Sequence, residues 1–269
     1  MNENIPVLDF GYLRLIESWG MGEAGEMEAA IIEAARQSTQ GAFRGWKSWV
    51  CSSCGQVFEE KVAHHYKKTM SQVHMPCYGK LSNDEQLLSF MFKNKHSTPF
   101  EFCGMTIEIQ APIVVFREWQ RHRTQGYNEM SARYAPLPDI NYMPTIDRLF
   151  LTQENNIQAQ AMKDSLPLNK GNAEGWIDRL KEAYTHCEKV YQRGLQIGIP
   201  KEIARLCLPV GRYSRMRATG NLRNWLGFLT LRMHPDAQWE IRQFATTLGT
   251  QIIANTFPKT WALFEKSIS

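Results

Sequence analysis

Hydrophobic and polar residues alternate with a period of two over residues 100–111 (FEFCGMTIEIQA), which is typical of a β-strand. Pro112 follows directly and suits the first turn of a helix, because its fixed φ angle and missing N–H fit that position. The expected helix, PIVVFREWQRH, places Arg117 and Arg121 four residues apart on one face. The stretch QRHRTQGYNEMSARY at 120–134 therefore lies at the end of this helix and in the loop after it.

Two later segments repeat apolar residues at steps of three and four, which predicts amphipathic helices. The first covers about residues 173–195 and is ended by Gly198, with Pro200 at the start of another helix. The second lies near the C-terminus. Both apolar stripes are expected to be core: Trp176, Leu180, Tyr184, Cys187, Tyr191 and Leu195 in the first, and Ile241, Phe244, Leu248 and Ile252 in the second.

A sheet-forming centre followed by a helical C-terminal half indicates an α+β fold. We expect one domain over residues 1–269 with a single interruption. Residues 135–172 are rich in Pro, Asn and Asp with weak periodicity, so we expect a loop or a partly ordered excursion there.

Composition restricts the class of protein. The 269 residues are 43% hydrophobic, which is enough for one large or two modest cores. A net charge of +4 is far from the excess of a protein that coats nucleic acid, so any anion site must be local. No signal peptide and no apolar run of about 20 residues is evident, and a cytoplasmic location is expected. Six cysteines then suggest thiols or metal ligands rather than a disulfide framework.

The arginine-rich stretch is the candidate for that anion site. Arg121, Arg123 and Arg133 carry planar guanidinium groups that match phosphate oxygens. Glu129 and Ser131 add an acceptor and a hydroxyl that could bind a sugar or a base. A solvated face with salt bridges and a nucleic-acid contact are the alternatives. Neither explains why the basic triplet is tied to a compact N-E-x-S-x-R-Y string.

The string RHRTQGYNEMSARY, with R-H-R, seven residues and then Ser, resembles the signature of the flavin-dependent thymidylate synthases, the ThyX family. Other segments resemble the family in its order: HSTPFEF at 96–102, AP at 111–112, EIARLCLP at 202–209, TGNLRNWLGFLTLR at 219–232 and AQWEIRQFA at 237–245. The resemblance implies a ThyX-like fold, with a central, mostly antiparallel sheet flanked by helices.

The same resemblance implies an activity. It is the reductive methylation of dUMP at C5, with methylenetetrahydrofolate as carbon donor and NADPH reducing bound FAD. It also implies a homotetramer whose active sites are shared among subunits. From the sequence itself, no membrane partner is expected, and the charge balance does not favour nucleic acid as a partner.

Roles for individual residues follow from the resemblance alone. The implied cofactor-binding residues are Thr98, Arg121, His122, Arg123, Glu129, Asn221, Arg223 and Gly227. The implied substrate-binding residues are Glu118, Arg121, Glu129, Met130, Ser131, Ala132, Arg133, Arg205 and Arg232. Arg232 and His96 are the implied catalytic residues. A guanidinium beside the pyrimidine N3 and O4 would raise electron density at C5, whereas the alternative for Arg232 is a helix-flanking ion pair.

Four positions depart from the family pattern: Gly126, Glu118, Gly227 and Asp236. Glu118 stands where a Gln that contacts the nucleotide is common, and a carboxylate only accepts hydrogen bonds, so this departure bears on the substrate rather than on the cofactor. C5 methylation or hydroxymethylation of UMP or dCMP is therefore an alternative to dUMP methylation. A degenerate member that binds nucleotide without turnover is a weaker one.

Residues 47–82 are an insertion relative to the family pattern, since FRGW at 43–46 and NDEQLLSFMFKNKH at 83–96 would normally lie close together. The insert holds Cys51-x2-Cys54 and His74-x2-Cys77, close to the spacing of a Cys3His zinc site. A metal would order a small module that has little core. An ordinary loop is the alternative, and His64 or His65 could compete as ligands.

A zinc knuckle next to the lysine-rich YKKTMSQVH would instead suit a nucleic-acid-binding protein, a second class of function. The remaining thiols, Cys103, Cys187 and Cys207, lie in apolar patterns and are expected to be buried.

Overall fold

A computed structural model describes residues 3–22, 26–39, 42–46, 49–51, 57–58, 63–67, 74–81, 84–151, 160–162 and 165–268, with backbone alone for the residues between 49 and 81. The chain divides into two compact units. The first comprises Met1–Glu17, Met105–Gly220 and Gly227–Gly249, and the second comprises Ser18–Gly104, Asn221–Leu226 and Thr250–Ser269.

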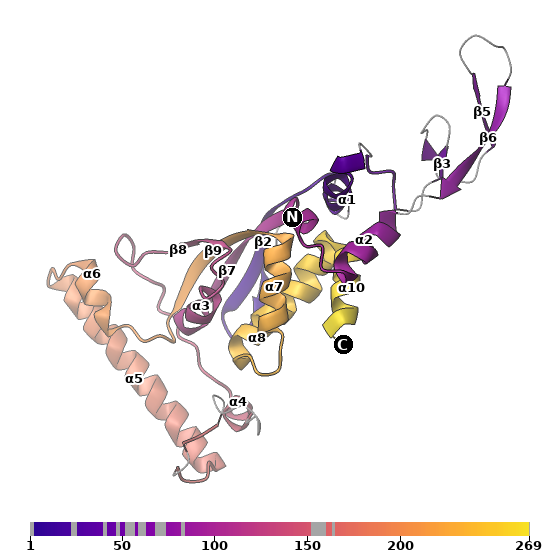
Figure 1. Ribbon diagram of the computed structural model, residues 1–269. Coiled ribbons are helices and arrows are strands. Elements are labelled where there is room, and N and C mark those ends of the chain that lie inside the picture. The colour runs from indigo at the N-terminus through magenta and orange to yellow at the C-terminus, as the bar shows by residue number, and fades with distance from the viewer. Residues whose placement is uncertain are drawn as a thin grey trace. The chain divides into compact units, whose positions relative to one another are not determined.

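A five-stranded sheet forms the centre of the first unit, with strands in the order β1-β2-β7-β9-β8 (Figure 1). The β1–β2 and β8–β9 pairs are antiparallel. The strands are β1 (Ile5–Val7), β2 (Gly11–Trp19), β7 (Gly104–Pro112), β8 (Gly126–Glu129) and β9 (Tyr213–Asn221). The predicted α+β class with a mostly antiparallel sheet is confirmed.

Strand β7 begins later than the sequence predicted, because Thr98–Glu101 form a 3-10 turn, η2. Pro99 near the start of this turn cannot supply the backbone N–H of a strand ladder. The helix expected from Pro112 is α3 (Ile113–Trp119), with Pro112 as its N-cap, and it ends three residues before His122. A short strand that the sequence analysis missed, β8, follows the loop after α3.

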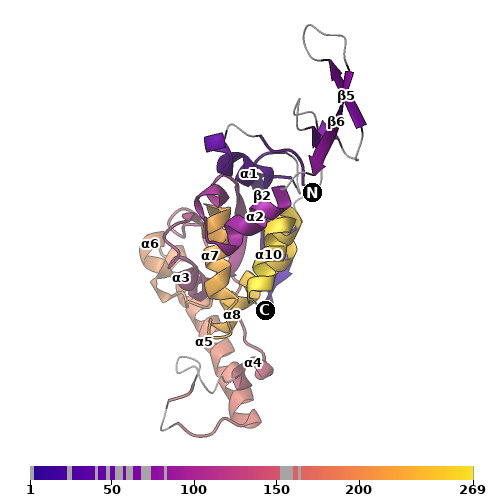
Figure 2. The same ribbon diagram turned by 45° about the vertical axis from the view of Figure 1, so that its right-hand side comes forward.

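Helices α3 and α8 (Trp239–Thr247) lie together against the sheet (Figures 1 and 2). The ring of Trp119 stacks on Phe228 at 4.5 Å and meets Phe244 edge-on at 6.4 Å. These three aromatic side chains are fully buried. A Cβ atom at Gly11 would lie 2.9 Å from the Phe244 ring and 2.5 Å from a backbone oxygen, so glycine alone lets β2 approach this closely.

The 27-residue helix α5 (Lys170–Gln196) is the predicted amphipathic helix and begins three residues earlier than expected. The side chain of Asn169 caps it by accepting from the N–H of Asn172. It ends with Gly198 at φ 84°, where the N–H of Ile199 donates to Gly194 O at 2.9 Å. This is the Schellman arrangement that glycine favours at a helix end, as the sequence indicated.

The predicted core role of the α5 stripe is largely wrong in the described chain. Tyr191 is buried, but Trp176 is 50% exposed, because the sheet and its helices contact only part of this helix. The C-terminal stripe is confirmed as core, since Ile241, Phe244 and Leu248 are fully buried and Ile252 nearly so. Residues 135–151 are mostly loop, as expected, except for α4 (Ile146–Phe150).

The second unit is mainly helical near its core. Helix α1 (Ala29–Ala35) packs on η2 and on α2 (Asp84–Lys93), which packs on α10 (Pro258–Ile268). The buried carboxylate of Glu28 accepts from the backbone N–H groups of Lys259 and Thr260 and so caps α10. Cys103 is buried as predicted, whereas Cys187 and Cys207 are only partly buried.

The second unit also holds a four-stranded sheet in the order β4-β3-β6-β5. Its strands pair antiparallel. They are β3 (Trp49–Cys51), β4 (Val57–Phe58), β5 (Ala63–Lys67) and β6 (His74–Leu81). All four strands fall inside residues 47–82, the range expected for the insert.

The remaining elements are short, apart from α7. They are η1 (Gln37–Thr39), α6 (Lys201–Ala204), η4 (Arg205–Cys207), α7 (Leu222–Arg232), the π-helical turn η5 (Leu248–Ile253) and α9 (Ala254–Thr256). None of the helices in the described residues is long and apolar enough to cross a membrane.

Arg212, which is 1% exposed, anchors α5 to the segment that leads into β9. Its guanidinium donates to Glu188 on α5 and to Asp139 Oδ1 at 2.5 Å.

We expect Arg212→Met to lower the free energy of unfolding by about 3 kcal/mol, because the nearly buried Glu188 carboxylate would lose its cation. Urea denaturation measures the change.

The exposed Arg193 on the same helix supplies the matched control, so Arg193→Met should change the free energy of unfolding by less than about 0.5 kcal/mol. The double variant Arg212→Met, Glu188→Leu should recover part of the loss, because no uncompensated charge is left. Equal stability of Arg212→Met and the unchanged protein would show that the ion pair does not anchor α5.

Candidate functional site

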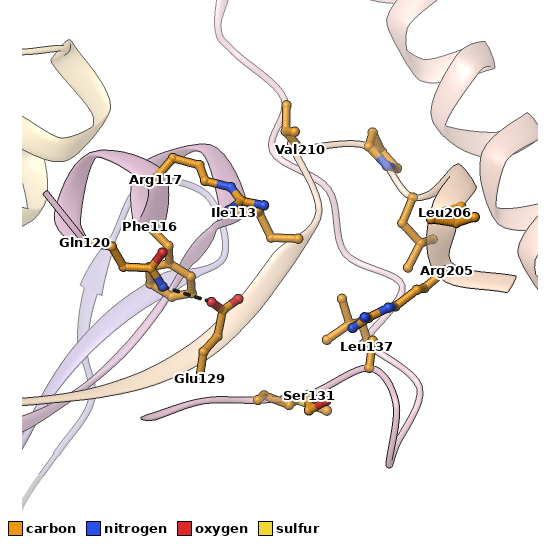
Figure 3. Close-up of a pocket in the computed structure, with 14 residues that line it drawn as sticks. Ile113, Phe116, Arg117, Gln120, Glu129, Ser131, Leu137, Arg205, Leu206 and Val210 are labelled. Atoms are coloured by element: carbon orange, nitrogen blue, oxygen red, sulfur yellow. Dashed lines mark hydrogen bonds between the residues drawn. The ribbon is translucent and has the colours of Figure 1, made fainter. Parts of the chain in front are cut away.

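A cavity of about 510 Å³ opens on the first unit between α3, the end of β8 and the segment 205–210 (Figure 3). Four of the predicted substrate residues from one stretch line it, Glu129–Ala132, together with Arg205 from a segment more than seventy residues away. The rest of the wall is apolar apart from Arg117 and Gln120. We call this cavity the unit 1 pocket. The structure therefore brings five predicted substrate residues to one place.

The floor of the unit 1 pocket is set by a turn at Ser131. The N–H of Met130 donates to Arg215 O at 2.7 Å, which fixes the end of β8 on β9. The N–H of Tyr134 then donates to Ser131 O at 3.1 Å, and the N–H of Arg133 reaches the Ser131 hydroxyl at 3.3 Å. This turn holds the Ser131 hydroxyl beside the pocket.

Glu202 on α6 connects two of the predicted substrate-binding arginines, Arg133 and Arg205. Its carboxylate pairs with Arg133 at 3.2 Å, and its backbone oxygen accepts from Arg205 Nε at 3.4 Å. Arg133 itself does not line the pocket, and both partners of its ion pair are more than half exposed. Such a pair is weak and readily exchanged for a bound anion.

A second cluster lies at the C-terminal end of α7. Arg232 donates to Glu118 Oε2, to Glu118 O and to His122 Nε2, each at 2.9 Å. The Arg232 side chain is 16% exposed. These contacts fit the alternative role of Arg232, an ion pair beside a helix. The catalytic role of Arg232 stays a prediction. Neither Arg232 nor Glu118 lines the unit 1 pocket.

The imidazole of His122 is held in place by the same cluster. It lies edge-on to Phe228 at 4.8 Å, and the hydroxyl of Tyr127 donates to its backbone oxygen at 2.6 Å. Burial, and then the charge of Arg232, lower the pKa of His122 from 6.5 to about 4, although Glu118 acts in the opposite direction. His122 is therefore neutral at pH 7. Arg121 and Arg123 on either side of it are exposed.

The other predicted cofactor residues fall into both units. In the second unit, Arg223 pairs with Glu101, and the Asn221 side chain accepts from the N–H of Asn224 at the start of α7. His96 and Thr98 are exposed there. In the first unit Gly227 is exposed, and a Cβ atom at this position would meet no atom within 4 Å.

The predicted zinc ligands lie outside the side chains that the structure describes. Cys54 falls in a part that is not described at all, and Cys51, His74 and Cys77 are described by backbone alone. Among the described residues, no group of three or more His, Cys, Asp or Glu side chains could hold a metal ion.

Sequence reasoning missed Arg117 and Gln120 as pocket residues. Their spacing on α3 was visible, but only the return of segment 205–210 to α3 encloses them. The N–H of Val114 donates to Val210 O, and that of Ile113 to Arg212 O, both at 2.9 Å. A contact between segments so far apart in the sequence leaves no local pattern.

Comparison with known proteins agrees with the fold. Residues 15–259 match the family described as thymidylate synthase complementing protein, Thy1. The flavin-dependent thymidylate synthase of Ehrlichia ruminantium (strain Gardel) is 31% identical over 258 residues, which are 96% of this chain and 71% of the relative. The enzyme of the same name from Thermus thermophilus is 29% identical over 264 residues, covering 98% of this chain and 79% of the relative.

A solved structure shares the fold. The UMP/dUMP methylase PolB from Streptomyces cacaoi, bound with 5-Br UMP, superposes with a TM-score of 0.70 and 28% identity over 97% of this chain and 96% of that one. The same protein bound with 5-Br dUMP gives a TM-score of 0.69.

The class of protein is therefore a flavin-dependent methyltransferase. Within that class, the chain belongs to the Thy1 family of flavin-dependent thymidylate synthases.

The low pKa of His122 predicts a pH dependence of stability. A His whose folded-state pKa is lowered takes up a proton in the unfolded chain first, so its contribution is complete above pH 6.5 and is lost as the pH falls towards 4. We therefore expect the unfolding free energies of the unchanged protein and His122→Gln to converge as the pH is lowered from 7 to 4.5. Urea denaturation at several pH values measures this convergence.

The matched control is His186→Gln on the exposed face of α5, whose difference from the unchanged protein should not vary in this way. Direct titration by NMR should also show the His122 ring neutral at pH 5. A ring that protonates near pH 6.5 would contradict the burial and the Arg232 contact as its determinants.

Proposed function

We propose that the protein methylates C5 of dUMP to give dTMP, with methylenetetrahydrofolate as carbon donor and NADPH as reductant of FAD. The observation that carries the proposal is the unit 1 pocket, which joins the Ser131 turn to Arg205 in a chain that matches the Thy1 family over residues 15–259. We also propose that both units form one catalytic domain, with residues 47–82 as an inserted module in it. A cytoplasmic location stays a prediction.

Each part of the nucleotide has a suitable partner in the unit 1 pocket. The guanidinium of Arg205 and the hydroxyl of Ser131 would bind the phosphate, because a fixed cation and a donor match its oxygens. The carboxylate of Glu129 would accept from a sugar hydroxyl. Apolar atoms of Phe116, Ile113 and Leu137 would exclude water from the ring side of the substrate.

The residues of the chain also suit FAD. Arg121 and Arg123 are exposed guanidinium groups on one short loop, and two such groups match the diphosphate of a dinucleotide. His122 lies between them, and its neutral ring is held in place by Arg232 and Phe228. A flavin ring could pack against an aromatic ring held in this way. When bound, FAD supplies the hydride that the reductive methylation needs.

The assembly that we propose is a homotetramer with shared active sites. Exposed apolar side chains flank the unit 1 pocket, including Leu206 at 77% and Val210 at 60% exposure, and Trp176 on α5 is half exposed. Apolar surface of this kind is what a second copy would cover. Light scattering should then give the mass of four chains, and a monomer at micromolar concentration would contradict shared sites.

UMP is the second candidate substrate, because the superposed PolB structure is described as a UMP/dUMP methylase. The sequence analysis linked Glu118 to the choice between dUMP and other nucleotides. That link is weaker in the structure, because the Glu118 carboxylate pairs with Arg232 outside the unit 1 pocket. Both candidates demand the same phosphate contacts. Product mass from assays with dUMP, UMP and dCMP separates them.

Arg205→Ala should raise the nucleotide KM about tenfold or more and change kcat much less, because it removes one charge-assisted contact to the phosphate. The measurement is NADPH oxidation with methylenetetrahydrofolate and varied dUMP, with dTMP confirmed by mass. Arg193→Ala on α5 removes a similar charge at an exposed position and should leave both constants unchanged. A purified protein that retains no flavin and forms no dTMP would contradict the proposed function.

We propose in addition that the insert binds one zinc ion through Cys51, Cys54 and Cys77 with one histidine. The backbone register pairs Cys51 with Gly79 and Cys77 with His64. Directly paired residues share a face of a sheet, whereas residues three apart in a strand do not. The register thus favours His64 as the fourth ligand over His74, the histidine that the Cys/His spacing had indicated.

Metal analysis tests the zinc proposal without an activity assay. We expect about one zinc per chain, and its loss in Cys77→Ser. His64→Ala should lose the metal, whereas His74→Ala should keep it. Retention of zinc in Cys77→Ser would contradict this ligand set.

A further inference from the structure

Gln120 and Glu129 form a polar pair in the wall of the unit 1 pocket, which α3 also lines with Ile113, Phe116 and Arg117. Gln120 lies just after the last turn of α3, and Glu129 ends β8. Gln120 Nε2 donates to Glu129 Oε2 at 3.2 Å and lies 3.9 Å from the sulfur of Met216, whose side chain is buried. Figure 3 shows the two side chains meeting on the wall across from Arg205.

Some acceptor atoms of this pair make no hydrogen bond within the described part of the chain. One carboxylate oxygen of Glu129 and the amide oxygen of Gln120 have no recorded partner among the described residues. Both residues are partly exposed and line the pocket. Each residue of the pair therefore keeps an acceptor atom, in a pocket that Phe116, Ile113 and Arg117 of α3 also line.

Two neighbouring residues that each keep an acceptor can bind two adjacent donors. The 2′- and 3′-hydroxyls of a ribose stand next to each other on one side of the ring, whereas a deoxyribose offers only the 3′-hydroxyl. With its phosphate on Arg205 and Ser131, a nucleoside monophosphate would direct its sugar towards Glu129. Gln120 would then meet the second hydroxyl, if there is one.

We infer that Gln120 is a specificity residue for the sugar: its amide binds the ribose 2′-hydroxyl while Glu129 binds the 3′-hydroxyl, so the enzyme accepts UMP as well as dUMP. The inference rests on the proposed function and names a substrate class for the same pocket. A Gln120 that served only to orient Glu129 would affect both nucleotides equally, which separates the two roles.

The first experiment compares kcat/KM for UMP and dUMP in the unchanged enzyme and in Gln120→Leu. We expect the value for UMP to fall about tenfold, the loss of one hydrogen bond, and that for dUMP to change less than about threefold. Gln196→Leu, at the exposed end of α5, is the matched control and should alter neither value. Flavin content and the thermal midpoint report whether each variant is folded.

The second experiment needs no variant. Binding of UMP, dUMP and 2′-fluoro-dUMP to the unchanged enzyme is measured by calorimetry. Because a fluorine cannot donate a hydrogen bond, 2′-fluoro-dUMP should bind like dUMP and more weakly than UMP.

The inference is overturned if Gln120→Leu lowers both values of kcat/KM equally, or if the fluoro compound binds as tightly as UMP. Either result leaves the proposed function intact as long as dTMP is still formed. If the unchanged enzyme binds none of the three nucleotides, the proposed function fails as well.

Discussion

The antiparallel pairing of β8 with β9 is the contact on which the unit 1 pocket depends. Its register sets Gly126 opposite Thr219 and Glu129 opposite Met216. The chain leaves β8 into the Ser131 turn and enters β9 from the segment 205–212, so both walls of the pocket are attached to one ladder. A slip of one residue would turn Glu129 to the other face of the sheet, away from Gln120. The chemistry of the pocket thus depends on a short ladder of four residue pairs.

Arginine serves two purposes in the first unit, and the partners of the guanidinium groups distinguish them. Arg212 and Arg232 are largely buried, and their guanidinium groups are bound to acidic side chains. They fix helices α5 and α3, because a buried cation is destabilising unless acidic partners compensate its charge. Arg117 and Arg205 line the pocket with apolar neighbours, and Arg117 is exposed. The structural arginines hold the walls, and the pocket arginines are suited to an anionic ligand.

The sequence was informative where a residue acts locally. The alternation in β7, the glycine that ends α5 and the proline before α3 each have a local physical cause, and each predicted its element. It was less informative where tertiary contacts decide. Strand β8 carries no apolar alternation because it lies at the edge of the sheet, so no periodicity marked it. The apolar residues of α5 recur with the spacing of a buried helix face, but no other element of the described chain covers most of them.

The same distinction applies to the candidate site. Glu129–Ala132 and Arg205 were found from a motif and do meet in the pocket, whereas Gln120 and Arg117 came only from the structure. Glu118 and Arg232 were expected at the substrate but bind each other. Their sequence positions could not show this, because the pairing joins residues that are 114 positions apart.

The contact between Arg232 and His122 also fixes the tautomer of the imidazole. Arg232 Nε always carries its proton, so His122 Nε2 must be the acceptor and the neutral ring keeps its proton on Nδ1. The side chains of the R-H-R loop therefore offer donors only: two guanidinium groups and one Nδ1–H. At neutral pH it can bind an electron-rich atom of a ligand, but it cannot take a proton from one.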